Sequence, residues 1–312
     1  MKNKIICLAI GVISSLIIVE LLLRVAAFGY NLAYRVPKNY KDSDYRILCI
    51  GESTTLGIGT SNPSVSCYPH QLEKRLNEKF PDLRIKCFYD QSVGINTTQN
   101  LIKLPSAIRN YQPNLVIFMV GTNNRWNLDK SNILLFNKNG LFQQTYFKLC
   151  VFLSQFRVYK LFKWLIYSNG LIKLANLVQW PDESSGNVEN TKIRIKMSED
   201  LNKSIEEKYN TNIFDEIAYY DLQEMIKICK EKKISIIICS YPSQQSSCNL
   251  YLIQMKLALL FSCYFVDNRL IFSKLSNAKD YFSYDKDHPN EKGYGVIAEN
   301  IYNCILEHKL VK

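Results

Sequence analysis

From Tyr45 onward, short β-rich runs alternate with helical patterns, and this alternation restricts the possible folds more than any other feature of the sequence. Runs of β-branched and aromatic residues bounded by turn residues predict strands. The five candidate strands are residues 45–50, 85–89, 114–120, 234–240 and, more weakly, 264–266. Because strands separated by helices pair in parallel, we expect an α/β fold with an open five-stranded parallel sheet.

Predicted helices fill most of the intervals between these strands. They cover residues 68–80, 97–111, 213–232, 251–263 and 292–309. The interval 125–210 is far longer than a simple crossover, so we interpret it as an insertion or lid. We therefore divide the chain into an amino-terminal segment, 1–30, and a body, 31–312, that carries this insertion.

The first half of the insertion, residues 141–180, is dense in Phe, Tyr, Trp and Leu and contains no acidic residue. Its five basic residues are Lys148, Arg157, Lys160, Lys163 and Lys173. A helical cap that packs on the body with its lysines in water is one interpretation. An interfacial helix that lies on a membrane is the other. Residues 182–190 read as a polar loop that ends the cap.

The amino-terminal segment contains an apolar run long enough to cross a bilayer. Lys2 and Lys4 precede residues 5–19 and 21–23, which are almost uninterruptedly apolar and together approach the roughly 20 residues that a membrane-spanning helix needs. Glu20 and Arg24 can reach the interface or pair at i, i+4. A cleavable signal peptide is the alternative, but the run is long for one, so we favour an uncleaved transmembrane helix.

The distribution of basic residues predicts how this helix is oriented. Lysines before the apolar run, with no second long apolar stretch after it, place the amino terminus inside and the body outside the cytoplasm, on the periplasmic or extracellular face. Four basic residues after the run oppose that orientation: Arg24, Arg35, Lys38 and Lys41.

A net charge of +11 is not accompanied by a helix-turn-helix, zinc-finger or RNP-like pattern, so we expect no nucleic-acid partner. A positive surface facing anionic lipid or polymer suits a membrane-anchored chain better. The ten cysteines form no Cys-x-x-Cys pair, and Cys49 and Cys239 lie inside strand-like runs. We expect buried free thiols, with a Cys67–Cys87 disulfide as the open alternative.

Candidate catalytic residues follow the predicted strands. Ser53, in the sequence Gly51-Glu52-Ser53, comes directly after the first strand, where open α/β sheets build their active sites. The alternative role for this serine is an ordinary helix cap. Gly94 follows the second strand and Asn123 the third, and each alone could be a turn residue.

Asp285 and His288 lie near the carboxyl terminus, three residues apart. One turn can therefore hold the Asp285 carboxylate against the imidazole of His288, which fixes its tautomer and stabilises the imidazolium. The alternatives are a solvated acidic loop or a metal site that includes Asp287. The metal site lacks further histidine ligands, because we expect His70 and His308 on the surface.

The order of these motifs resembles the SGNH/GDSL hydrolase family, which implies a flavodoxin-like three-layer α/β/α sandwich. By that resemblance Ser53 is the nucleophile, His288 the base and Asp285 the residue that orients it. The oxyanion hole would consist of the Ser53 and Gly94 N–H groups and the Asn123 side-chain amide. The resemblance implies no metal and no organic cofactor.

The resemblance covers residues 47–308 and has two departures. Glu52 replaces the aspartate of the familiar Gly-Asp-Ser, and Asn124 stands where many relatives carry aspartate. Both lie beside a proposed catalytic group and replace none. Glu52 could alter how the substrate fits.

Together these residues indicate acyl transfer. The leading hypothesis is a serine hydrolase that acts on O-acyl groups of an envelope glycan or on lipid esters. The alternatives are an O-acyltransferase that modifies a surface polysaccharide and a non-catalytic anchored binding protein.

Overall fold

The structure is a computed structural model that describes residues 2–33, 43–89, 93–125, 127–136, 141–168, 213–242 and 248–311. At its centre is a five-stranded parallel sheet of order β2-β1-β3-β4-β5, the flavodoxin-like order. The strands are β1 (Tyr45–Gly51), β2 (Ile85–Tyr89), β3 (Leu115–Met119), β4 (Ser235–Cys239) and β5 (Tyr264–Val266). All five predicted strands are confirmed, and two are shorter by a residue at each end.

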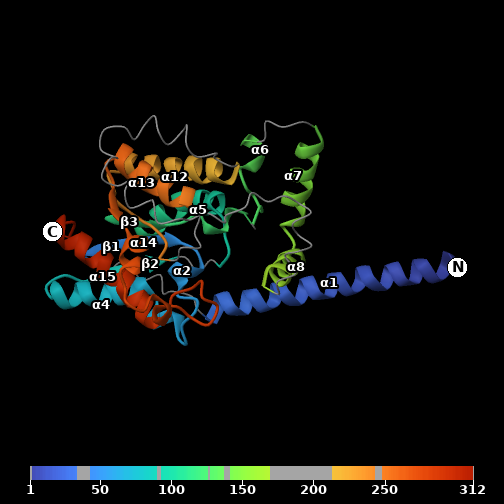
Figure 1. Ribbon diagram of the computed structural model, residues 1–312, viewed down its shortest axis with the longest axis horizontal. Coiled ribbons are helices and arrows are strands. Elements are labelled where there is room, and N and C mark those ends of the chain that lie inside the picture. The colour runs from blue at the N-terminus through green and yellow to red at the C-terminus, as the bar shows by residue number, and fades with distance from the viewer. Residues whose placement is uncertain are drawn as a thin grey trace.

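Helices cover both faces of the sheet, as Figure 1 shows. One face carries α4 (Tyr68–Lys79), α14 (Asn268–Ser273) and α15 (Glu291–Glu307), and the other carries α5 (Thr97–Tyr111), α12 (Ile213–Glu231) and α13 (Cys248–Leu260). The predicted helix 251–263 begins and ends three residues too late. It ends early because Ser262 takes a φ of 49° and leaves the helical conformation.

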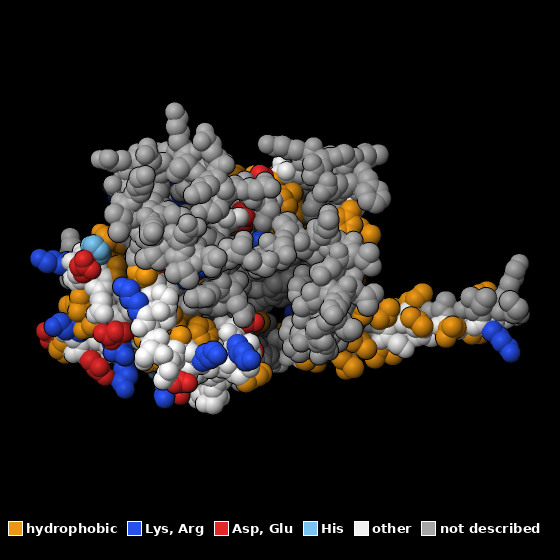
Figure 2. All heavy atoms as spheres, in the orientation of Figure 1, with side chains coloured by type: hydrophobic (Ala, Val, Ile, Leu, Met, Phe, Trp, Pro, Cys, Tyr) orange, Lys and Arg blue, Asp and Glu red, His pale blue; other side chains and the backbone are white. Residues whose placement is uncertain are grey.

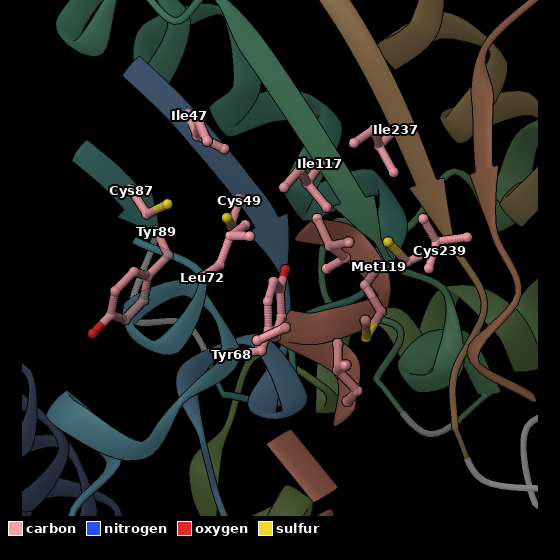
Figure 3. Close-up of a cluster of buried hydrophobic side chains, with 14 of the residues drawn as sticks. Ile47, Cys49, Tyr68, Leu72, Cys87, Tyr89, Ile117, Met119, Ile237 and Cys239 are labelled. Carbon is pink, nitrogen blue, oxygen red and sulfur yellow. The ribbon is translucent and has the colours of Figure 1, made fainter. Parts of the chain in front are cut away.

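The period of two along each strand divides the core into two clusters. Ile47 and Cys49 of β1 pack with α4 and α15 (Figure 3), whereas Leu48 and Ile50 pack with α5, α12 and α13. Every residue from Ile47 to Ile50 is buried, which explains why the strand is continuously apolar rather than alternating. The three-layer sandwich is confirmed.

The cysteines with described side chains are free thiols. Cys67 and Cys87 are both buried and are not joined to each other. Burial raises the pKa of Cys67 to about 11, so its thiol stays protonated at neutral pH and acts as a small hydrophobe.

A single long helix, α1 (Lys2–Ala33), forms the amino-terminal segment. Its stretch Ile6–Gly29 is long and apolar enough to cross a membrane, and its most apolar part is not buried against the body. Hydrophobic side chains coat the helix where it projects from the body (Figure 2). Arg24 pairs with Glu20 at 2.7 Å, as the i, i+4 spacing predicts. Residues 35, 38 and 41, which bear on orientation, lie outside the described residues.

The 3-10 turn η1 (Thr122–Arg125) leads into the insertion. The described part of the insertion contains the helices α6 (Ile133–Phe136), α7 (Leu141–Leu153) and α8 (Arg157–Ser168). The inner face of this region joins α12 in a third apolar cluster that includes Leu128, Ile133, Cys150 and Phe214. The rest of the insertion, with Lys173 and the expected polar loop 182–190, lies outside the described residues, as does the side chain of Lys163.

Candidate active site

Ser53 lies at the carboxyl end of β1, near the middle of the sheet. The strand ends at Gly51, Glu52 follows in a non-helical conformation, and Ser53 begins the short helix α2 (Ser53–Leu56). A Cβ at Gly51 would overlap the Thr55 side chain. Glycine at this position therefore lets the chain turn sharply enough to place Ser53 above the strand end.

His288 reaches Ser53 from a distant part of the chain. Its Nε2 atom is 2.8 Å from the Ser53 hydroxyl oxygen, and its Nδ1 atom is 2.7 Å from Oδ2 of Asp285. The structure thus brings together the three side chains that the sequence selected for acyl transfer. All three residues are partly exposed.

The charge of Asp285 determines which nitrogen of His288 carries the hydrogen. Partial burial raises the pKa of Asp285, but hydrogen bonds from Ser283, His288 and Asp287 outweigh that effect and lower it to about 2. Because an ionised carboxylate only accepts, Nδ1 of His288 must carry the hydrogen of that contact. Nε2 is then left to accept the hydrogen of the Ser53 hydroxyl.

The loop that carries His288 is held by its own hydrogen bonds. Ser283 Oγ donates to Asp285 Oδ1 at 2.6 Å, and the backbone N–H of His288 donates to the same oxygen at 3.0 Å. Gly59 lies close against this loop. A Cβ at Gly59 would be only 2.8 Å from the carbonyl oxygen of Pro289, so a larger residue would push the loop away. Ser283 and Gly59 were not singled out from the sequence.

Glu52 is buried, and its carboxyl group receives hydrogen bonds from the ends of two neighbouring strands. Gly121 N–H donates to Oε1 at 2.9 Å, and the Tyr241 hydroxyl lies 3.0 Å from Oε2. The Asn123 amide also donates to Oε2, at 2.9 Å. Burial raises the pKa of Glu52 to about 8, although these hydrogen bonds oppose the rise.

Asn123 is the residue whose surroundings differ most from expectation. It lies in η1, beyond the end of β3, and is buried next to Glu52. Its side-chain Nδ2 donates to Glu52 and to the carbonyl oxygen of Ile95, at 2.9 and 3.1 Å. Both amide hydrogens therefore have protein acceptors, whereas we expected one to point toward a substrate oxygen.

Gly94 is buried just before the amino terminus of α5. Its carbonyl oxygen accepts a 2.6 Å hydrogen bond from the Asn127 side chain. Asn96 then caps α5 in a capping box with Gln99. The residues between β2 and this segment, 90–92, lie outside the described part of the chain.

Asn124, the second departure from the family pattern, faces α5 rather than Ser53. Its Oδ1 accepts from the Thr97 N–H and its Nδ2 donates to the Thr97 hydroxyl, both at 2.9 Å. The side chain therefore ties the end of β3 to the first turn of α5. Sequence reasoning missed Tyr241 as well, although it follows β4 by two residues at the same edge of the sheet.

The described residues contain no group of three or more His, Cys, Asp or Glu side chains that could hold a metal ion. His308 is exposed at the end of α15, with its ring 4.6 Å from that of Tyr264. His70 is partly buried in α4.

No family model matches the sequence, and no curated protein matches it either. Solved structures with a similar overall arrangement include a protein described as a GDSL-like lipase from Parabacteroides merdae, at 16% identity and a TM-score of 0.49 over 86% of this chain and 98% of that one. A lipase/acylhydrolase from Enterococcus faecalis has 10% identity and a TM-score of 0.49, over 85% and 96%.

A family 3 carbohydrate esterase from Clostridium thermocellum has 14% identity and a TM-score of 0.47, over 84% of this chain and 96% of the esterase. The fold assignment rests on this chain's own parallel sheet, its strand order and its two helical layers. By these features the chain has the flavodoxin-like α/β/α architecture that the resemblance to SGNH/GDSL hydrolases implied.

Proposed function

We propose that the protein is a serine hydrolase that cleaves carboxylic esters through an acyl-enzyme. The observation that carries this proposal is the continuous chain of contacts from Asp285 through His288 to Ser53, at 2.7 and 2.8 Å. A serine, a base within hydrogen-bonding reach and a group that orients the base are the minimum parts of an activated nucleophile.

The reaction begins when His288 Nε2 takes the Ser53 hydroxyl proton while Oγ attacks the ester carbonyl carbon. The tetrahedral intermediate collapses, the C–O bond to the alcohol breaks, and the alcohol leaves with the proton from His288. Water then attacks the acyl-enzyme, with His288 taking its proton. Release of the carboxylic acid returns the proton to Ser53. Asp285 stabilises the imidazolium in both halves of the reaction.

The oxyanion donors in this proposal are the N–H groups of Ser53 and Gly94 and the side-chain amide of Asn123. To donate to the oxyanion, Asn123 must share or give up one of its two present hydrogen bonds. The bond to Glu52 is the one more easily lost, because Glu52 keeps other donors. Its carboxyl group keeps the Gly121 N–H and the Tyr241 hydroxyl, at 2.9 and 3.0 Å. Exchange of one hydrogen bond then costs little.

We place the body outside the cytoplasm, held to the membrane by α1, and assign the substrate to O-acyl groups of an envelope glycan or to lipid esters. The apolar stretch Ile6–Gly29, with Lys2 and Lys4 before it, supports this placement. The net charge of +11 suits a surface that faces anionic lipid or polymer.

Labelling with a fluorophosphonate tests the nucleophile directly, because the probe forms a bond only with an activated serine. We expect wild-type protein to label at Ser53 and the variant Ser53→Ala to stay unlabelled. Ser64, an exposed serine outside the site, provides the control variant Ser64→Ala, which should label like wild type. If folded wild-type protein fails to label, the chain is an anchored binding protein and the proposal is wrong.

A panel of acetyl, butyryl and longer esters then tests the substrate class. Preference for acetyl esters supports a glycan substrate, whereas preference for chains longer than butyryl supports a lipid ester. An acetylated product that forms only with a glycan acceptor, with negligible acetate release, identifies an O-acyltransferase in place of a hydrolase.

A further inference from the structure

Glu20 and Arg24 are the charged residues inside the apolar stretch of α1, and the structure gives them partners at and just before the start of α8. One oxygen of the Glu20 carboxylate pairs with Arg24 and the other accepts the backbone N–H of Val158 at 2.9 Å. Arg24 in turn donates to the carbonyl oxygen of Gln155 at 3.3 Å. The Glu20 side chain is only 12% exposed.

These contacts dock α8 against α1, and Figure 1 shows the two helices side by side. Val158 is the second residue of α8, so its N–H has no acceptor within the helix. A carboxylate is favourable there because it also faces the positive end of the helix dipole. Charged residues within a membrane-spanning segment are costly, so those that occur normally have a defined partner.

The point of docking lies near one end of the apolar stretch. Glu20 is 14 residues beyond Ile6, which at helical rise is about 21 Å along α1. The hydrocarbon core of a bilayer is about 30 Å thick. If the span begins near Ile6, α8 therefore meets α1 about 9 Å before the far boundary between the hydrocarbon and the headgroups. An interfacial helix buries its apolar face about 5–10 Å into that boundary, so this depth suits α8.

The outward side chains of α7 and α8 match that depth. Leu149 and Phe152 of α7 and Phe162 of α8 are 53%, 53% and 62% exposed, which is unusual for large apolar residues. Lys148 and Arg157 are exposed on the same two helices. Apolar residues beside basic ones form the surface that suits the boundary of an anionic bilayer.

We propose that the outward faces of α7 and α8 rest on the same anionic bilayer that α1 crosses, with Glu20 docking α8 to α1 at the membrane boundary. We assign the bilayer to this surface because α1, which crosses it, contacts α8 directly. This holds whatever reaction the body performs. The inference is thus independent of the proposed hydrolase activity.

The docked helix is also connected to the edge of the sheet that carries Ser53. Lys160 of α8 lies 3.7 Å from Asp129, and Asp129 accepts from the Gln99 side chain at 3.0 Å. Gln99 belongs to the capping box at the start of α5, which follows Gly94 in the chain. Contact of α8 with the membrane therefore orients the carboxyl ends of the strands, where Ser53 lies, relative to the bilayer.

Photocrosslinking in the full chain tests the proposal. p-Benzoylphenylalanine is placed at Phe152 or Phe162, with Val12 in α1 as the position expected in lipid and Leu259 in α13 as an exposed apolar control away from it. The protein is reconstituted in vesicles of phosphatidylcholine and alkyne-tagged phosphatidylglycerol. We expect lipid adducts at 152 and 162 at several times the yield at 259. A yield equal to that at 259, or adducts with a second protein chain in place of lipid, would overturn the proposal.

Two further variants separate docking from charge. Glu20→Leu removes the acceptor of the Val158 N–H and should lower the lipid adduct at 162 several-fold while leaving the adduct at Val12 unchanged. Lys148→Gln with Arg157→Gln should lower the adduct at 162 by roughly 25-fold, since each basic residue near an anionic surface contributes about a factor of five. Circular dichroism confirms that each variant is folded. If folded Glu20→Leu crosslinks at 162 like its parent, Glu20 does not dock the helix.

Discussion

Two carboxyl groups beside Ser53 show opposite behaviour, and the difference comes from where their hydrogen bonds originate. Asp285 is partly exposed, and its donors belong to its own loop, within three residues on either side. Glu52 is fully buried, and its donors come from the ends of β3 and β4, at Gly121, Asn123 and Tyr241. The pKa of Asp285 falls to about 2, whereas burial raises that of Glu52 to about 8.

This difference suits two different tasks. A carboxylate that must stabilise an imidazolium has to stay charged, and local hydrogen bonds with access to water keep it so. Glu52 only holds the neighbouring strand ends together by hydrogen bonds, and this role does not require a charged carboxylate. The Tyr241 hydroxyl lies 3.0 Å from both Glu52 Oε2 and the Met119 carbonyl oxygen, so this buried donor links the Glu52 carboxyl group to the end of β3.

The variant Asp285→Asn should have the largest effect on activity. The asparagine amide favours the wrong tautomer of His288, and the corresponding change in a serine protease lowers kcat by about 10⁴. Steady-state hydrolysis of an activated ester measures the loss. Glu52→Gln provides the comparison and should cost far less, because it mimics the neutral form of that residue. Equal losses in the two variants would mean that the two carboxyl groups do not differ in role.

Asn123→Ala should reduce kcat by about 10²–10³, the usual cost of losing one oxyanion donor. The same change removes a hydrogen bond to Glu52, so a purely structural role predicts lost stability with normal turnover of the folded fraction. Thermal unfolding and kcat measured on one preparation separate the two. An Asn123→Ala enzyme with a wild-type kcat would remove Asn123 from the oxyanion hole.

The two carboxyl groups should affect stability in opposite directions as pH changes. The raised pKa of Glu52 means that the folded chain holds a proton that the unfolded chain releases between about pH 4.5 and 8. Its contribution to stability is therefore lost as pH rises through that window, with a slope of at most about 1.4 kcal/mol per pH unit. Melting temperatures of Glu52→Gln should be flatter than wild type there.

Asp285 gives the matching control in acid. Its lowered pKa means that its contribution is present above about pH 4 and is lost as pH falls toward 2. Asp285→Asn should flatten the melting profile only in that lower window. The comparison breaks down if Glu52→Gln changes the acidic limb and leaves the region from pH 4.5 to 8 untouched.

Tyr241→Phe should produce the smallest effect. It removes one hydroxyl that contacts Glu52 and the Met119 carbonyl oxygen in a buried site, which typically costs about 1–2 kcal/mol. The variant also removes an influence that lowers the pKa of Glu52, so the loss of stability on raising pH should shift to higher pH. Denaturant unfolding at several pH values measures both effects. Ser283→Ala is the comparison in the other region and should leave that window unchanged.

Much of the fold could be predicted from local sequence. Continuous apolar runs such as 47–50 identified the buried strands, and helical spacing identified α4, α5, α12 and α15. The boundaries of α13 were displaced by three residues because its apolar residues surround it nearly evenly, which leaves periodicity with no face to detect. The composition of the insertion did not predict how its helices are arranged, because a basic aromatic helix suits both a cap on the body and a helix on a membrane surface.

The candidate site likewise has a part that the sequence predicted and a part that it did not. Asp285 and His288 were readable because three residues of spacing are enough to bring them into contact. Ser53, Gly94 and Asn123 were selected by their positions after strands, since parallel strands end at a common edge. The environment of Glu52 was not readable, because Tyr241 and Gly121 are remote in sequence and converge only once β1, β3 and β4 are neighbours.

The sequence by itself determined the α/β class, the apolar amino-terminal helix and the choice of residues that we propose for acyl transfer. These depend on periodicity, hydropathy and short spacings, which are properties of the unfolded chain. Only the tertiary structure decided that His288 faces Ser53, that the Asn123 amide rests on Glu52 and that Glu20 docks α8 to α1. Each of these contacts joins residues far apart in sequence, so its geometry exists only after the sheet and its helices have packed.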